Sequence, residues 1–284
     1  MDKAAWKHLH CDGVRAGPQV VMFFLAPIRL IWANRWMVFA TLMHDLRQRH
    51  GASVFGMTWT VLFPIIFLGL YSLVFNLILQ VRIPGKSSFD YTLIIFSGLI
   101  PFLGFSEALS SGVGSLIDNR SLLKGTIFPV ELIAVKSVLV SSVTMLVGLV
   151  LLLAILGASG EMRITQIALP IILLIQFFFT VGIIWTLSIL NIFFRDIANL
   201  VSPLLLFLML VSPIGYTDEM IPPEMMPVMV VNPLYYMISI YRDLIHFGRI
   251  PGERLAAFGG ASVALFILSY HFFQRLKPMA ADHV

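Results

Sequence analysis

Long runs of apolar residues, separated by short polar segments, make up most of this chain. A helix needs roughly 20 consecutive apolar residues to cross the hydrocarbon core of a bilayer. The pattern therefore predicts an all-α polytopic membrane protein with six transmembrane helices, of which the fifth is short for a crossing. The predicted spans are 54–79, 91–116, 132–156, 167–193, 198–213 and 255–273.

The N-terminal part has a different pattern. Residues 1–22 are polar, and we expect them to form a disordered tail. Over 23–50, apolar residues from Leu25 to Leu46 recur at steps of three or four, while charged residues from Arg29 to Arg49 interrupt them. Apolar periodicity with this much charge is typical of an amphipathic helix that lies in the membrane interface.

The link between the fifth and sixth spans, 214–254, is too apolar for a solvated loop and contains several prolines. Two helical pieces fit it, 223–231 and 233–246, and neither is long enough to cross a bilayer. We interpret the link as a re-entrant hairpin on the outer side, covered by protein or lining a cavity. The alternative is that one piece pairs with the fifth span to make a broken crossing.

A short polar segment, DNRSLLKGTIFPVE at 118–131, separates the second and third spans. On a helix Arg120 and Lys124 would share one face, and Leu123 and Ile127 another. Pro129 would end that helix, because proline cannot continue one. The segment predicts a small amphipathic helix that a soluble partner could bind, and the alternative is an ordinary positively charged cytoplasmic loop.

Composition supports the membrane class, since 58% of residues are hydrophobic and 12% are charged, against about 25% in soluble domains. The one cysteine, Cys11, excludes an internal disulfide framework, and we do not expect a metal site with the nearby His8, His10 and Asp12. The net charge of +4 is not interpreted as nucleic-acid binding. Placing both termini in the cytoplasm puts thirteen of the nineteen Lys and Arg residues on the inner side, as the positive-inside rule favours.

Candidate catalytic chemistry is sparse. The sequence has no phosphate-binding loop and no histidine–carboxylate pattern at metal spacing. Glu107 is the clearest charge inside a predicted span, and we expect it to face a polar cavity or a dimer interior. Tyr216, Tyr235, Tyr236 and Tyr241 lie in or beside the hairpin, where their rings could stack on sugars or form an interfacial aromatic belt.

Several short motifs follow one another in a fixed order. They are SVFG at 53–56 with Trp59 and Pro64, SGLIPF at 97–102, NRSLLK at 119–124, Phe128-Pro129 with Glu131, FRD at 194–196, SPI at 212–214, NPL at 232–234 and Tyr241-Arg242. In this order they resemble the motifs of the transmembrane subunits of ABC-2-type polysaccharide exporters, which move O-antigen, capsule or teichoic-acid chains. Phe55 and Phe102 depart from the leucine and tryptophan usual in that family.

The resemblance implies an ABC-2 (type V exporter-like) fold over 51–274, with a cytoplasmic tail at 275–284. It implies a non-enzymatic permease of the bacterial inner membrane, which works as a homodimer with two copies of a separate ATPase that binds ATP and Mg. The segment 23–50 would be a gate helix, and the hairpin 214–254 a periplasmic gate. The ATPase would dock on the coupling loop, 117–131, through Asp118, Asn119, Arg120, Leu122, Leu123 and Lys124.

The implied substrate is an undecaprenyl-pyrophosphate-linked polysaccharide, and the motifs at 232–234 and 241–242 favour O-antigen. Its pyrophosphate could contact Arg35, Arg47, Arg49 and Arg195, whose alternative role is topology and headgroup binding. Candidate channel or gate residues are Phe102, Glu107, Tyr216, Tyr235 and Tyr236. The alternatives are a capsule or teichoic-acid permease, an ABC-2 drug or lipid exporter, a secondary transporter without an ATPase, and a membrane scaffold or polymerase subunit.

Overall fold

The computed structural model describes residues 16–50, 55–74, 88–119, 129–216 and 220–283. Within these ranges every regular element is helical, which confirms the all-helical prediction. The chain forms two compact units, Met1–Arg35 and Trp36–Val284, and each is described by itself.

The first unit contains α1 (Ala16–Ala33), which begins inside the segment expected to be disordered. The predicted single helix over 23–50 is divided at Asn34, after which α2 (Arg35–His50) begins. The Asn34 amide donates to the Leu30 carbonyl at 2.9 Å, a local bond through which asparagine favours helix ends over helix interiors. The break depends on this polar side chain, so the periodicity of the apolar residues did not show it.

Four helices of the second unit are long and apolar enough to cross a membrane. Two further apolar helices, at 15 and 16 residues, are shorter than a full crossing. The C-terminal helix extends to His283, so most of the predicted tail at 275–284 continues the last span as helix. The long helices are α4 (Ser88–Gly112), α7 (Glu131–Ala158), α8 (Leu169–Phe193), which the 3₁₀ turn η3 (Ile164–Ala168) precedes, and α12 (Gly252–His283); the shorter ones are α3 (Trp59–Leu73) and α9 (Asp196–Val211).

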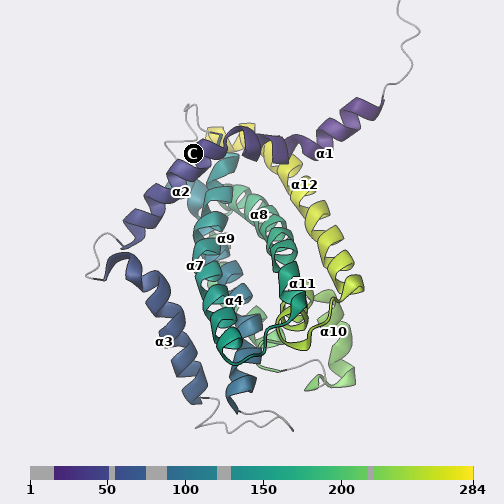
Figure 1. The fold of residues 1–284 in the computed structure, drawn as a ribbon. Helices are drawn as coiled ribbons and strands as arrows, with labels where there is room; N and C mark the ends of the chain where they lie inside the picture. The colour runs from purple at the N-terminus through teal and green to yellow at the C-terminus, as the bar shows by residue number, and fades with distance from the viewer. Residues whose placement is uncertain (1–15, 51–54, 75–87, 120–128, 217–219, 284) are drawn as a thin grey trace, which may run out of the picture. The chain divides into compact units, whose positions relative to one another are not determined.

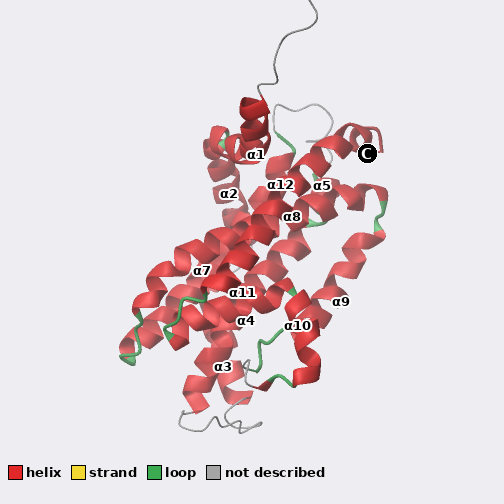
Figure 2. Ribbon diagram, turned by 90° about the vertical axis from the view of Figure 1, so that its right-hand side faces the viewer, coloured by secondary structure: helices red, strands yellow, loops and turns green. Residues whose placement is uncertain are grey.

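Helix α4 forms the centre of the second unit, with α7, α8 and α11 packed around it (Figures 1 and 2). In the apolar stretch of α4, 83% of the residues are buried, against 33% in the corresponding stretches of α7 and α12. Glycines on α4 allow this close packing, because a Cβ at Gly98 or Gly112 would lie 2.7 Å from an isoleucine side-chain carbon, on Ile238 or Ile184. Small residues at such contacts let membrane helices approach one another closely.

The link after α9 contains two short helical pieces at the positions that the sequence predicts. The first comprises η5 (Pro223–Met225) and α10 (Met226–Val231), and the second comprises α11 (Pro233–Arg242) and a π-helical turn, η6 (Asp243–Phe247). Asn232 separates them and caps α11, its side-chain oxygen accepting from the Leu234 N–H at 3.0 Å. Eight of the ten α11 residues are buried, which explains why this link is too apolar for a solvated loop.

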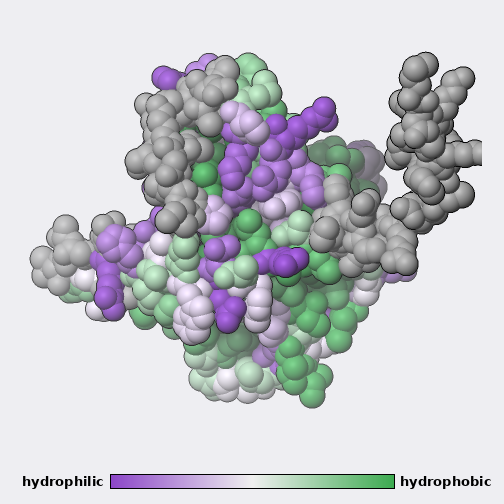
Figure 3. Space-filling model, turned by 90° about the horizontal axis from the view of Figure 1, so that it is seen from above, coloured by the Kyte–Doolittle hydropathy of each residue, from purple (hydrophilic) through white to green (hydrophobic). Residues whose placement is uncertain are grey.

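The two ends of the second unit differ in character. The C-terminal end of α12 and α5 (Ser115–Asp118) lie at one end, and α10 and α11 lie toward the other (Figures 1 and 2). Figure 3 looks down on the end that carries the C-terminal part of α12 and shows hydrophilic side chains gathered there. That distribution is the one expected for a helix bundle whose polar side chains collect where the spans leave the lipid.

Gly98→Ala tests whether the close packing of α4 on α11 determines stability. The new methyl group would collide with the stiff, β-branched Ile238, so we expect a loss of about 1–3 kcal/mol. The measurement is the temperature at which the detergent-purified protein loses its monodisperse peak in size-exclusion chromatography. Gly260→Ala on α12 is the matched control, since no atom lies within 4 Å of its Cβ position. Equal melting of both variants would contradict this account.

Candidate functional site

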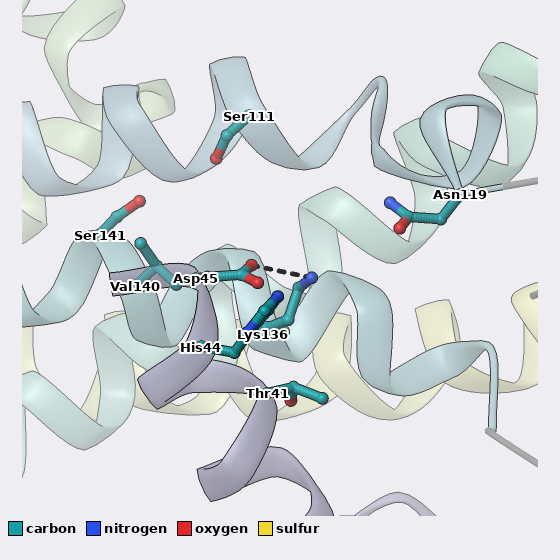
Figure 4. Close-up of a pocket in the computed structure, with 8 residues that line it drawn as sticks. All are labelled: Thr41, His44, Asp45, Ser111, Asn119, Lys136, Val140 and Ser141. Carbon is teal, nitrogen blue, oxygen red and sulfur yellow. Dashed lines mark ion pairs between the residues drawn. The ribbon is translucent and has the colours of Figure 1, made fainter. Parts of the chain in front are cut away.

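A polar cavity of about 640 Å³ lies between α2, α4 and α7, next to the end of α5 (Figure 4). Helix α2 contributes three residues to its wall, α4 one and α7 three, and one follows α5. Seven of the eight lining side chains are polar, which is unusual among apolar spans. The lining residues are Thr41, His44, Asp45, Ser111, Asn119, Lys136, Val140 and Ser141.

An ion pair at this cavity joins α2 to α7. Lys136 Nζ lies 2.8 Å from Asp45 Oδ2, and the two side chains are 19% and 30% exposed. Lys136 stands within the long apolar helix α7, where a charge without a partner would be costly. Asp45 therefore compensates Lys136 and at the same time holds the second half of α2 against the bundle.

The remaining polar groups define what the cavity could bind. Ser111 Oγ donates to the Glu107 carbonyl at 3.0 Å, and Ser141 Oγ donates to the Ser137 carbonyl at 3.1 Å. Each hydroxyl proton is thus used within its own helix, and the hydroxyl oxygens remain available as acceptors. Because Asp45 balances Lys136, a ligand that carries its own hydroxyl groups fits this cavity better than a bare anion.

A second polar cluster lies at the beginning of α7. Glu131 is 1% exposed, and its Oε1 accepts from Gln274 Nε2 and from Lys277 Nζ, both at 2.7 Å. Its main-chain carbonyl accepts from Trp185 Nε1 at 2.9 Å. Burying a carboxylate costs several kcal/mol, and the cation and the hydrogen bonds offset this cost at Oε1, while Oε2 is buried without a hydrogen-bond partner. Glu131, the first residue of α7, therefore connects this helix to both α8 and α12.

Arg242 organises the opposite end of the second unit. Its side chain is buried, and Nη1 donates to the Tyr216 carbonyl at 2.9 Å. Its Nη2 donates to the Pro213 carbonyl at 2.7 Å and to the Ile214 carbonyl at 3.2 Å. The Tyr91 hydroxyl donates to the Gly215 carbonyl at 2.7 Å. These bonds satisfy a turn of irregular backbone, which would otherwise be unfavourable at membrane depth.

Gln176 ties the middle of the bundle together. Its Oε1 accepts from the Tyr241 hydroxyl at 2.7 Å, and its Nε2 donates to the Pro101 carbonyl at 2.9 Å. The Pro101 carbonyl lies on α4, Gln176 on α8 and Tyr241 on α11. One amide side chain thus holds three helices in register.

The candidate tyrosines do come together. Tyr235 is 4% exposed and packs with Ile221 and Met229, while Tyr216 and Tyr236 lie against this core half-buried. The Tyr216 hydroxyl donates to the Val211 carbonyl at 2.7 Å. Burial raises the pKa of Tyr216 although the positive charge of Arg242 opposes that rise, so the hydroxyl stays protonated at neutral pH. Of the three, Tyr236 is the one that is partly exposed and whose hydroxyl makes no main-chain hydrogen bond among those described.

Phe102 and Glu107 occupy apolar surroundings on α4. Phe102 is 2% exposed, so its ring is buried within the subunit and does not face an opening. Glu107 lines a cavity of about 50 Å³ whose other walls include Phe63, Phe67 and Met145. Within the single subunit this cavity is apolar, because the aromatic side chains of α3 cover this part of α4, and the alternative that Glu107 faces a dimer interior stays a prediction.

Two of the four candidate arginines, Arg47 and Arg195, have described side chains in the same unit as the polar cavity. Arg35 belongs to the first unit, where its guanidinium lies 5.3 Å from the Trp32 ring centre. Arg47 and Arg195 are exposed, and neither lines the polar cavity. Arg49 is within α2, and its side chain lies outside the part that the structure describes.

Two of the six predicted coupling-loop residues are described. Asp118 is exposed at the end of α5, and Asn119 lines the polar cavity and donates to the Ser115 carbonyl at 2.8 Å. The other four lie outside the described residues, namely Arg120, Leu122, Leu123 and Lys124. Among the residues that are described, no group of three or more His, Cys, Asp or Glu side chains is placed to hold a metal ion.

Sequence reasoning missed Lys136 and Gln176 as site residues, although each is a polar side chain inside a predicted span, and that signal marks functional or structural polar contacts. It also missed the partners of Glu131. The two partners of its carboxylate, Gln274 and Lys277, lie more than 140 residues away along the chain, so no local pattern could identify them.

Comparison with known proteins places this sequence clearly. The ABC-2 type transporter family matches residues 37–246. An O-antigen export system permease protein, RfbA of Klebsiella pneumoniae, is 32% identical over 84% of this chain and 91% of its own length. RfbA of Myxococcus xanthus is 26% identical over 90% of this chain and 98% of its own length. The polysialic acid transport protein KpsM of Escherichia coli is 25% identical over 74% of this chain and 81% of its own length.

Arg242→Lys tests the role of the buried guanidinium. Lysine keeps the charge but cannot reproduce the planar fork that reaches three carbonyls, so at least one charged hydrogen bond is lost. We expect destabilisation by roughly 1.5–3 kcal/mol, seen as a lower melting temperature in detergent. Arg249→Lys, on an exposed side chain just beyond η6, is the control. Wild-type melting of Arg242→Lys would contradict the anchoring role.

Proposed function

This chain belongs to the ABC-2 type transporter family, and we propose that it is the permease subunit of an ATP-driven exporter of lipid-linked polysaccharide, specifically O-antigen. The observation that carries the proposal is its similarity to O-antigen export permeases over more than nine-tenths of their length. Capsular polysaccharide is the second candidate substrate, because a polysialic acid transport protein also matches, with lower identity and coverage.

We propose that the channel is built from six crossings in each of two identical subunits. The four long helices would cross fully, and α3 and α9 would complete the count despite their length. Helix α9 exposes a row of large apolar side chains, including Leu206, Phe207 and Leu210, each about 60–70% exposed. Such a face suits lipid or a second copy of the chain and does not suit water.

We propose that both termini and the coupling loop, 117–131, face the cytoplasm, and that the hairpin α10–α11 is a re-entrant element near the periplasm. The positive-inside distribution supports this orientation. The common position of α5 and the end of α12 supports it as well, because both lie at the polar end of the bundle (Figure 2). A partner ATPase that binds ATP and Mg would act from that end.

The polar cavity fits a role in substrate entry. It lies between the second half of the proposed gate helix and the bundle, so a sugar chain entering there would meet hydroxyl, amide and imidazole groups before apolar spans. Arg35, Arg47, Arg49 and Arg195 remain proposed contacts for the pyrophosphate on the cytoplasmic side. In this arrangement the charge of the lipid head stays near the interface while the sugars enter the cavity.

Co-purification tests the proposed function. The full chain is expressed with the ATPase encoded beside it and reconstituted in lipid nanodiscs, and ATP hydrolysis is measured. We expect a complex of two permease and two ATPase subunits, and we expect Arg120→Glu with Lys124→Glu to lower the coupled ATPase rate at least about tenfold, since the loop charges reverse. A chain that binds no ATPase would contradict the proposal.

Substrate binding tests the four arginines. We expect the combined replacement of Arg35, Arg47, Arg49 and Arg195 by glutamine to weaken binding of labelled undecaprenyl pyrophosphate by roughly tenfold or more, because charged hydrogen bonds to phosphate are lost. The combined replacement of Arg82, Lys86, Arg163 and Arg249 by glutamine, at four positions predicted to lie on the outer side, serves as the charge-matched control. Unchanged binding in the fourfold variant would remove these residues from the substrate site.

A further inference from the structure

Glu131 lies where three helices meet at the end of the coupling loop. It is the first residue of α7, and its side chain is fastened to α12 while its main-chain carbonyl is fastened to α8. The turn just before it is fixed as well, since the Leu132 N–H donates to the Pro129 carbonyl at 3.0 Å. A displacement of this turn therefore cannot occur without disturbing Glu131.

The two helices that Glu131 contacts are themselves tightly joined. The Thr186 hydroxyl on α8 donates to Ser269 Oγ on α12 at 2.9 Å. The Trp185 ring packs against the rings of Phe266 and Tyr270, at centroid distances of 4.9 and 5.5 Å. Because α8 and α12 are packed along their length, a force applied at one residue of this pair moves both.

We propose that Glu131 is a positioning residue for energy coupling, and that its carboxylate, bonded to Gln274 and Lys277, transmits movement of the coupling loop to the C-terminal helix. This inference rests on the proposed function, because it requires an ATPase that moves the loop. It adds a specific route, from the first residue of α7 into α8 and α12, and the α12 end of that route lies beyond the family match over residues 37–246.

The chemistry of the contact suits transmission. Glu131 is 1% exposed, so water cannot readily replace its partners when they move apart, whereas Lys277, at 37% exposure, closes the contact from the outside. Two charge-assisted hydrogen bonds of 2.7 Å to one oxygen fix both the distance and the orientation of Gln274 and Lys277 relative to Glu131. Separation would leave a buried charge without compensation, so the three residues move together.

The test compares exported polymer with ATP hydrolysed, in complexes of the full chain and its ATPase in proteoliposomes. Glu131→Gln keeps the size and the acceptor oxygen but removes the charge. We expect polymer exported per ATP to fall about tenfold, because both hydrogen bonds lose the charge of the carboxylate, with ATP hydrolysis within about twofold of wild type. The swapped pair Glu131→Lys with Lys277→Glu should recover at least half of the lost export, since Gln274 can bond to either charge.

Ser262→Ala is the matched control, because it breaks a buried hydrogen bond to the Phe258 carbonyl within α12 without changing charge or removing a contact between helices. It should lower melting slightly and leave the polymer-to-ATP ratio unchanged. A wild-type ratio in Glu131→Gln, an equal loss in Ser262→Ala, or no recovery in the swapped pair would each overturn the inference. An ATPase that binds and drives export by the wild-type chain keeps the proposed function in all three cases, whereas its failure to bind the wild-type chain would overturn both.

Discussion

The hydrogen-bonding requirement of buried polar groups is the constraint on which this bundle depends. Lipid provides no partner for an amide, a guanidinium or a carboxylate, so each such group inside the spans must find its partner on the protein. In this chain the partner is usually on a different helix. Gln176 joins α4, α8 and α11, and Glu131 joins α7, α8 and α12. The hydrogen bonds of these buried groups therefore form only when the helices are correctly arranged.

The same constraint explains why the two ends of the second unit are built differently. Near the hairpin, Arg242 is buried and donates to three main-chain carbonyls, so its role is to stabilise irregular backbone. At the opposite end, the buried carboxylate of Glu131 pairs with Lys277, and the partly exposed Asp45 pairs with Lys136. A buried charge that loses its partner is costly, so these ion pairs hold α7 to α12 and to α2. The end proposed to receive force is thus joined by ion pairs between helices.

Apolar packing defines how closely the helices approach before these bonds form. The glycines of α4 let its neighbours approach closely, and Gln176 of α8 bonds both to the Pro101 carbonyl of α4 and to Tyr241 of α11. Helix α3 has no buried residue, and it covers Glu107 with aromatic rings. A carboxylate that looked functional in the sequence therefore lies against phenylalanine side chains within one subunit, and its surroundings in an assembly depend on what covers α3.

The sequence by itself determined the class of this protein, the places of its long helices and the family to which it belongs. Those features follow from local information, namely the length of apolar runs, the positions of prolines and an ordered set of short motifs. It also predicted the two helical pieces on either side of Asn232. Only the tertiary structure decided which charges pair, because Asp45 and Lys136, or Glu131 and Lys277, are separated by about 90 and 150 residues of chain. It also showed that Phe102 and Tyr235 are buried. When a helix is apolar on every side, periodicity does not identify the side that faces the core, because that side depends on the neighbouring helices.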